Sequence, residues 1–261
     1  MPQISAVIIT FNEEKNIARC IESVRNVADE ILVVDSFSQD DTERICRSCG
    51  ATFMQHAFEG HIEQKNYAMA RARHDYILSL DADEALSPGL EASIAAVKRD
   101  WKRDGYECSR LTSYCGQWIR HSGWYPDRKL RLFDRRKATW GGVNPHDRII
   151  MSPGATTMRL QGDLLHYTFS SIAGHLAQIN TFSGIKAEGL FRKGKKVTPW
   201  TMVIEPLFKF FKNYVLKAGF LDGWYGLIIS VNSAHAVFVR YAKLYEKNRA
   251  ARTQKQHDLF F

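Results

Sequence analysis

Short apolar runs alternate with polar stretches through the first third of the chain. Three of these runs, at residues 4–9, 30–34 and 76–80, are rich in Val, Ile and Leu. Runs of five or six residues with this composition are typical of strands buried on both faces of a sheet. A weaker run at residues 51–54 predicts one further strand.

Helical patterns separate these runs. Apolar residues between 17 and 24 recur at helical spacing after Asn12, which is expected to cap that helix. A second helix is expected to end at Gly50, and a third covers residues 61–73. Strands that alternate with helices at this spacing predict a largely parallel sheet with helices on both faces, in the α/β class.

Polar residues follow three of the expected strands: Thr10-Phe11-Asn12-Glu13, Asp35 and Asp81-Ala82-Asp83. In an open parallel sheet, ligands bind outside the carboxyl ends of the strands. These side chains therefore converge where a ligand is expected. For Asp35, a helix cap at the strand end is the alternative.

The D-x-D pair of Asp81 and Asp83 has a direct chemical interpretation. Alternate residues of an extended segment point to the same side, so the two carboxylates can share a divalent cation such as magnesium. The alternative is a solvated turn that caps a helix beginning near Ser87.

Composition supports a globular chain. Hydrophobic residues make up 45% of the 261 and aromatic residues 12%, which argues against global disorder. The N-terminus lacks the features of a signal peptide. The nearest candidate for a membrane-spanning helix, residues 223–239, is uncharged but contains Asn, Ser and His, which indicates a buried or interfacial helix. The five cysteines are expected to be reduced, including the C-x-x-C pair of Cys46 and Cys49.

Positive charge is concentrated at the C-terminal end. Residues 186–261 hold 14 Lys or Arg against 5 Asp or Glu, whereas residues 1–185 hold 22 against 23. Such a segment indicates an anionic partner such as nucleic acid, phospholipid or a phosphorylated glycolipid. No nucleic-acid-binding motif accompanies the charge, so we expect no nucleic acid.

The stretches VIITFNEEKNI, ILVVDSFSQDDT and YILSLDADE together resemble the N-terminal half of family 2 inverting glycosyltransferases. This resemblance implies a GT-A fold, a UDP-sugar donor, and Mg²⁺ or Mn²⁺ bound to the D-x-D motif. It also implies the donor-binding residues: Thr10, Phe11 and Glu13 at the nucleoside, Asp35 at the uracil, Asp81 at the ribose or metal, and Asp83 at the metal. Lys65 is either a phosphate ligand or a solvated lysine.

Three further stretches narrow the resemblance. RHSGWYPDRKLRLF, LLHY and GFLDGWYGLIISVNSAHAVFVRYAKLYE are similar to bacterial lipopolysaccharide core β-1,4-glucosyltransferases, which transfer glucose from UDP-glucose to an inner-core heptose. The implied organisation is a catalytic domain at 1–185, with a nucleotide-sugar half at 1–100 and an acceptor half at 101–185, followed by a basic, aromatic helical region at 186–261. The chain departs from these relatives at His146-Asp147, where His-Glu is expected.

An inverting transferase needs one general base to deprotonate the acceptor hydroxyl. The order of elements in family 2 enzymes favours Asp147, and Asp127 is the second candidate. The alternatives are a salt bridge from Asp147 to Arg148, and a role for Asp127 in acceptor binding or in holding its loop. Arg131 is expected to stabilise the diphosphate, unless it is only a cation on the sheet surface.

Aromatic side chains near these carboxylates suit an acceptor platform, because their faces pack against sugar C–H groups; core packing is the alternative. The candidates are Trp124, Tyr125 and Trp140. His166, in LLHY, is either a third metal ligand with Asp81 and Asp83 or a structural hydrogen-bond donor.

Residues 206–218 predict an aromatic helix with three lysines, expected to begin at Pro206. Such a helix either lies on an anionic membrane surface or docks on the catalytic domain. A glycolipid acceptor would place the protein in the cytoplasm, on the inner face of the bacterial inner membrane. Three other functions remain open: transfer to another surface glycan, nucleotidyl transfer, and a non-catalytic membrane scaffold. The sequence leaves the oligomeric state open.

Overall fold

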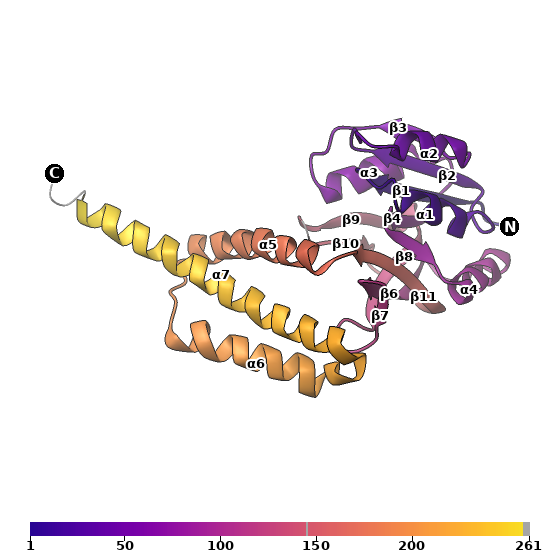
Figure 1. The fold of residues 1–261 in the computed structure, drawn as a ribbon. Coiled ribbons are helices and arrows are strands. Elements are labelled where there is room, and N and C mark those ends of the chain that lie inside the picture. Colours follow the sequence, from indigo (N-terminus) through magenta and orange to yellow (C-terminus); the bar gives the residue numbers. More distant parts are fainter. Residues whose placement is uncertain (145, 258–261) are drawn as a thin grey trace. The chain divides into compact units, whose positions relative to one another are not determined.

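A computed structural model describes residues 1–144 and 146–257 of the chain (Figure 1). The chain divides into two compact units. The α/β unit comprises residues 1–112 and 126–168, and the helical unit comprises residues 113–125 and 169 onward. Each unit has its own buried apolar cluster.

The α/β unit is built on a mixed sheet with the strand order β3-β2-β1-β4-β8-β6-β11-β5. Its strands are β1 (Ile4–Thr10), β2 (Glu30–Asp35), β3 (Thr52–Gln55), β4 (Tyr76–Asp81), β5 (Glu84–Leu86), β6 (Gly105–Tyr114), β8 (Asp127–Asp134) and β11 (Thr157–Phe169). A hairpin of β9 (Ala138–Val143) and β10 (His146–Met151) forms a second sheet, reached from β8 through the turn Arg135–Lys137. Its helices are α1 (Ile17–Val24), α2 (Thr42–Ser48), α3 (His61–Arg71) and α4 (Pro88–Arg99).

Alternate residues of the central strands are buried on opposite faces of this sheet. On β1, Ile4, Ala6 and Ile8 belong to a cluster that includes residues of α1 and α4, whereas Val7 belongs to a second cluster with Ala68 of α3. Both faces are therefore covered by helices, as the apolar runs predict.

The four expected strands are confirmed, and so is the α/β class, but two details differ. Strands β1 to β4 are parallel, whereas β8 pairs antiparallel with β4 and β6. Asn12 is not a helix cap, because α1 begins after Asn16. Asn12 instead adopts a left-handed backbone and links the loops after β1 and β2, donating its N–H to Ser38 and accepting from the N–H of Gln39.

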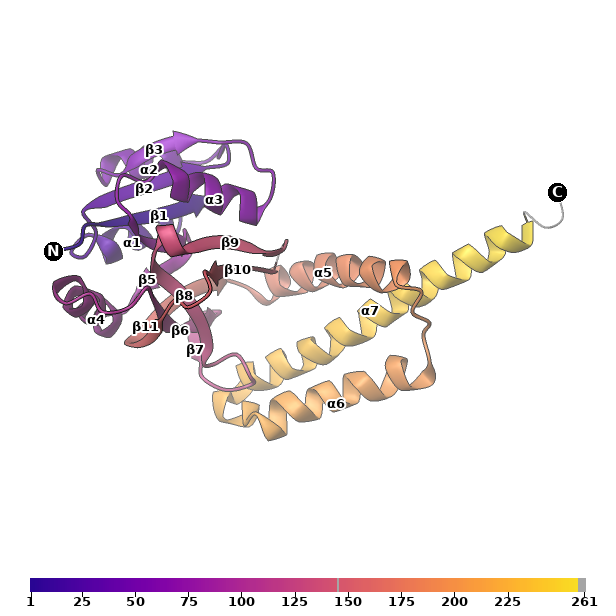
Figure 2. The ribbon, with the colours of Figure 1, turned by 180° about the vertical axis from the view of Figure 1, so that it is seen from behind.

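The helical unit contains α5 (Ile172–Arg192), a helical segment at 200–216, the turn Gly219–Asp222, α7 (Gly223–His257) and the short strand β7 (Gln117–Ile119). The segment at 200–216 consists of α6 (Glu205–Phe211) between two π-helical stretches, Trp200–Ile204 and Lys212–Leu216. Both α5 and α6 pack along α7 (Figure 2). The α-helix α6 begins at Glu205 with Pro206 in its first turn, close to the expected start, but the π-helical stretch Trp200–Ile204 precedes it and Pro206 is buried.

The division between the units does not fall at residue 185. Residues 169–185 belong to the helical unit because α5 begins at Ile172 and packs on α7. The loop 113–125 joins the same unit because Tyr114 and Ile119 are buried against Ile229 of α7. No helix in residues 1–144 and 146–257 is long and apolar enough to span a bilayer.

The five cysteines are free thiols. Cys46 is buried on α2, and burial together with the charge of Asp35 raises the pKa of its thiol to about 12. The thiol is therefore protonated at neutral pH, which argues against a reactive C-x-x-C pair.

Candidate active site

The carboxyl ends of β1, β2 and β4 lie side by side at one edge of the sheet. Thr10 is opposite Asp35, and Ile9 is opposite Asp81 in the parallel registers. The structure thus brings together the polar residues that follow these strands, as expected for an open parallel sheet.

Two residues at this edge differ in what they offer a ligand. The hydroxyl of Thr10 is buried and has no hydrogen-bond partner among the described residues, so it is available to a bound molecule. Asp35 is fully buried, and its carboxylate accepts hydrogen bonds from the backbone N–H and the hydroxyl of Ser38. Asp35 therefore stabilises the turn after β2. Phe11, which follows Thr10, is exposed.

Asp81, at the end of β4, lies between two cations. Its Oδ1 is 2.9 Å from Nζ of Lys65, and its Oδ2 is 3.1 Å from Nη2 of Arg131. Burial alone would raise the pKa of Asp81, but the charges of Lys65 and Arg131 outweigh it and hold that pKa well below its usual range. Asp81 is thus a charged group whose two oxygens are already paired.

Glu84 is the third carboxylate of the LDADE stretch, and it holds Arg131 and the backbone of Asp81 in place. It is buried, its Oε1 lies 2.7 Å from Nη2 of Arg131, and its Oε2 accepts the backbone N–H of Asp81 at 3.1 Å. Sequence reasoning assigned Glu84 no role. The sequence shows that Glu84 lies three residues after Asp81. It does not show that Glu84 pairs with Arg131, which is 47 residues away.

Arg131 and Lys65 are both buried, which excludes the surface-cation interpretation of Arg131 and the solvated interpretation of Lys65. Lys65 lies on α3 with its side chain only 4% exposed. The indole of Trp140 on β9 packs against both cations, 4.4 Å from Nζ of Lys65 and 5.7 Å from the guanidinium carbon of Arg131. Trp140 is itself 5% exposed.

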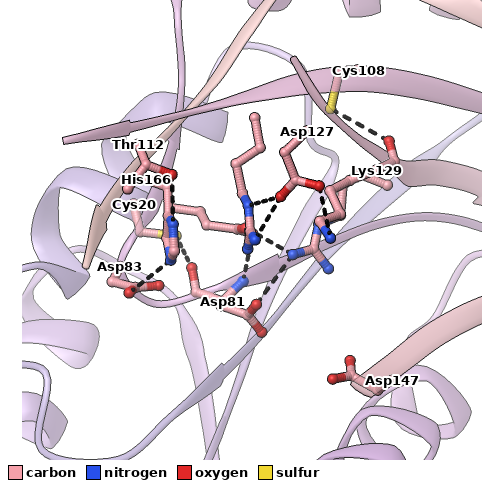
Figure 3. A network of polar contacts seen from close by, with 12 residues as sticks. Cys20, Asp81, Asp83, Cys108, Thr112, Asp127, Lys129, Asp147 and His166 are labelled. Carbon is pink, nitrogen blue, oxygen red and sulfur yellow. Dashed lines mark hydrogen bonds and ion pairs between the residues drawn. The ribbon is translucent and has the colours of Figure 1, made fainter. Parts of the chain in front are cut away.

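The two candidate bases have different partners. Asp147, on β10, contacts Nζ of Lys65 at 2.8 Å through Oδ2, so Lys65 bridges Asp147 and Asp81. Asp127, at the start of β8, is held by Arg110 at 2.7 Å and by Lys129 at 3.1 Å. Figure 3 shows Asp127 within a network of charged contacts, and Asp147 connects to Asp81 of that network through Lys65. The salt bridge expected between Asp147 and Arg148 is replaced by the contact with Lys65.

Asp83 and His166 form a second polar pair at this edge. Oδ2 of Asp83 lies 3.2 Å from Nε2 of His166, and Nδ1 of the same ring is 3.4 Å from the hydroxyl of Thr112 (Figure 3). The side chains are 20% and 14% exposed, so both are accessible to a ligand. Burial, and secondarily the charge of Asp83, raises the pKa of nearby Glu13.

This pair fits a divalent metal bound jointly by protein and ligand. No group of three or more His, Cys, Asp or Glu side chains in the described part of the chain is arranged to hold a metal. Asp83 and His166 supply one oxygen and one nitrogen donor, and a nucleotide diphosphate with water supplies the rest, as is common for Mg²⁺. Asp81 fits a metal less well, since Lys65 and Arg131 occupy its oxygens.

The other two acceptor candidates lie in the helical unit. Trp124 is half-buried in an aromatic cluster, with ring contacts to Tyr114, Phe169 and His175. Tyr125 is also half-buried, and the guanidinium carbon of Arg120 lies 5.7 Å from its ring. Trp124 thus packs within its own unit.

The mixed sheet, with β1 to β4 parallel and Asp81-Ala82-Asp83 at the end of β4, has the GT-A type of fold. The model of the family described as Glycosyl transferase family 2 matches residues 5–153, more than half of the chain. The chain belongs to this family.

Two relatives are similar to this protein over nearly the whole chain. An uncharacterized glycosyltransferase of Rickettsia typhi is 31% identical over 97% of this chain and 90% of its own length. The lipopolysaccharide core biosynthesis glycosyltransferase LpsC of Rhizobium meliloti is 26% identical over 94% and 93%. Among solved structures, glucosyl-3-phosphoglycerate synthase from Mycobacterium tuberculosis, crystallised with Mn²⁺ and UDP-glucose, is 22% identical over 43% of this chain and 44% of its own, with a TM-score of 0.37.

Proposed function

We propose that this glycosyltransferase transfers glucose, with inversion, from UDP-glucose to a heptose of the lipopolysaccharide inner core, and that it depends on a divalent metal. The likeness to LpsC over almost the full length of both chains supports the class of acceptor. The observation that carries the donor side is the pair of Asp83 and His166, which lies at the sheet edge where ligands of such folds bind.

On the donor side, each residue is assigned by its position. Thr10 ends β1, and Phe11 and Glu13 follow it. These three residues line the nucleoside site, with the unpaired hydroxyl of Thr10 as one hydrogen-bonding group. Asp83 and His166 would hold Mg²⁺ or Mn²⁺, which when bound neutralises charge on the departing diphosphate. The buried cations Lys65 and Arg131 add positive charge to the same edge, and Asp81 keeps them in place.

On the acceptor side, Asp147 is the proposed base. Asp127 has both oxygens in ion pairs, Oδ2 with Arg110 and Oδ1 with Lys129. Among the described contacts, Asp147 is engaged only through Oδ2, by Lys65. Its other oxygen remains to accept the proton of the acceptor hydroxyl, and Lys65 fixes the orientation of the carboxylate. The proton transfer itself contributes about 10²–10⁴-fold to the rate.

The acceptor class sets where the enzyme would work. A lipid-linked core glycan is presented on a membrane, and UDP-sugars are cytoplasmic, so we propose a peripheral protein on the inner face of the bacterial inner membrane. The basic segment at 186–261, with 14 Lys or Arg against 5 Asp or Glu, supports attraction to anionic lipid.

The test is an assay of several UDP-sugars against truncated core glycolipids, with Mg²⁺, with Mn²⁺ and with chelator, using the variants Asp147→Asn and Asp127→Asn. We expect Asp147→Asn to bind UDP-glucose normally and to lose at least about 10²-fold in kcat. Asp127→Asn is the matched control. If Asp127→Asn is inactive while Asp147→Asn is nearly normal, the roles are exchanged. If no UDP-sugar is transferred to any core acceptor, the proposed substrate pair is wrong.

A further inference from the structure

The helical segment at 200–216 exposes an apolar stripe. Its large apolar side chains recur at spacings of three and four residues, which places them on one face of a helix. The exposed members are Trp200, Val203, Ile204, Leu207, Phe208, Phe211, Val215 and Leu216. We call these eight residues the apolar stripe.

The opposite face of this segment is the one that packs inward. Pro206 and Asn213, seven residues apart, are buried, while Leu207 between them is 62% exposed. A helix that docks through its apolar face buries that face and exposes polar residues. This segment does the reverse, so ordinary docking within the helical unit does not account for its apolar residues.

The chain that follows the segment also exposes large apolar side chains. Phe220 and Leu221 in the turn at 219–222 are exposed, and Trp224 in the first turn of α7 is 80% exposed. Large contiguous apolar patches on a protein surface mark sites of interaction with a membrane or another protein.

Lysines accompany the stripe along the chain. Lys212, within the segment, and Lys217, just after it, are exposed. Lys209 lies on the inward face, three residues after Pro206 and four before Asn213, and burial, followed by the charges of Lys212, Lys186 and Arg240, lowers its pKa. Residues 186–261 hold 14 Lys or Arg against 5 Asp or Glu, so this part of the chain carries a net positive charge that attracts anionic lipid.

We propose that the apolar stripe, with Phe220, Leu221 and Trp224, inserts into the interface of an anionic phospholipid leaflet, and that Lys212 and Lys217 contact lipid phosphates. This inference deepens the proposed function, since it assigns the surface by which a glycolipid-modifying enzyme meets its membrane. Exposed aromatic and aliphatic side chains beside lysines match helices that lie in the plane of a membrane interface. A protein partner would not require the net positive charge of this part of the chain.

The first experiment measures binding of the full chain to vesicles of phosphatidylglycerol and phosphatidylcholine, and to phosphatidylcholine alone. We expect binding to the anionic vesicles that weakens with salt, because screening acts on the cations. Leu207→Ser with Phe208→Ser should reduce binding at least about tenfold, since apolar burial supplies much of interfacial affinity. Lys212→Gln with Lys217→Gln should reduce binding to anionic vesicles only.

The matched control is Phe58→Ser in the α/β unit, a side chain 52% exposed, which should leave vesicle binding unchanged. Equal binding by the control and the Leu207/Phe208 variant overturns the proposal. Circular dichroism verifies that each variant is folded, and turnover on a short soluble acceptor reports the catalytic site separately. If the Leu207/Phe208 variant loses vesicle binding but keeps turnover, the membrane-binding role of this surface is supported. If it loses turnover but keeps vesicle binding, only the proposed reaction is contradicted.

A second experiment does not depend on those variants. Tryptophan fluorescence of the wild-type chain should be quenched by brominated phospholipids, and the quenching should fall in Trp224→Phe and again when Trp200→Phe is added. Quenching that is unchanged in the double variant shows that this face does not enter the bilayer. A dimer in sedimentation velocity without lipid, converted to monomer by the Leu207/Phe208 substitutions, assigns the stripe to a second copy of the chain and overturns the lipid proposal.

Discussion

Replacing Lys65 by Met removes the cation that bridges Asp81 and Asp147. Nζ of Lys65 is 2.9 Å from Asp81 and 2.8 Å from Asp147, and the lysine side chain is 4% exposed. Methionine has a similar length but no charge, so the substitution leaves two carboxylates without their shared partner in a mostly buried position.

The expected cost follows from this geometry. Removing one partner of a buried ion pair typically destabilises a protein by about 3–5 kcal/mol, because the remaining charge is uncompensated. Asp81 keeps Arg131, and the side chain of Asp147 is 14% exposed, so the lower end applies. We expect Lys65→Met to lower the free energy of unfolding by about 3 kcal/mol at neutral pH.

The dependence on pH gives a second signature. The pKa of Asp81 is lowered in the folded state, so its contribution to stability is present above the unfolded pKa, about 3.9, and is lost as the pH falls through the folded value. Without Lys65 the folded pKa of Asp81 rises toward the unfolded one. The difference in stability between the wild type and Lys65→Met should therefore be largest near neutral pH and shrink below about pH 4.

Urea unfolding of the ligand-free protein, at pH 7 and at about pH 3.5, measures both effects. Lys98→Met is the matched control, because Lys98 pairs with Asp29 at 2.6 Å but the two side chains are 18% and 30% exposed. Such a partly exposed pair should contribute about 1 kcal/mol or less. If Lys65→Met costs no more than Lys98→Met, or if its cost does not depend on pH, the bridging role of Lys65 is refuted.

Two further predictions concern individual side chains. Asp83→Asn should abolish transfer and weaken metal-dependent UDP binding while the fold persists, because Asp83 and His166 offer the accessible donor atoms. Calorimetry with UDP, with and without Mn²⁺, measures the binding. Full turnover by the variant rules out the metal site. Trp124→Ala should destabilise the protein by about 3 kcal/mol, because Trp124 packs on Tyr114, Phe169 and His175. The KM for a soluble acceptor should stay unchanged. A raised KM without a loss of stability instead makes Trp124 an acceptor contact.

The sequence by itself determined the α/β architecture of the nucleotide half. The runs at 4–9, 30–34 and 76–80 are strands because apolar, β-branched segments of that length suit a sheet buried on both faces. The order of strands and helices also placed Asp81 and Asp83 at the ligand-binding edge, since parallel strands of one sheet end at the same edge. These are local patterns combined with one general rule of topology.

Only the tertiary structure decided which charges meet. Lys65 contacts Asp147, which is 82 residues away, and Arg131 contacts Glu84, which is 47 residues away. Spacing along the chain contains no information on such contacts, because β8 and β10 reach the site through the antiparallel part of the sheet and its hairpin. For the same reason, the role of Glu84 could not be predicted from the sequence.

The helical segment at 200–216 shows most clearly what local sequence does not predict. The spacing of its aromatic residues predicts one apolar face of a helix, but periodicity does not say which way that face points. Packing along α7 buries Pro206 and Asn213, so the apolar stripe faces outward. Helix content could therefore be predicted from local sequence, whereas the direction of the stripe depends on which residues α7 covers, and only the folded chain decides that.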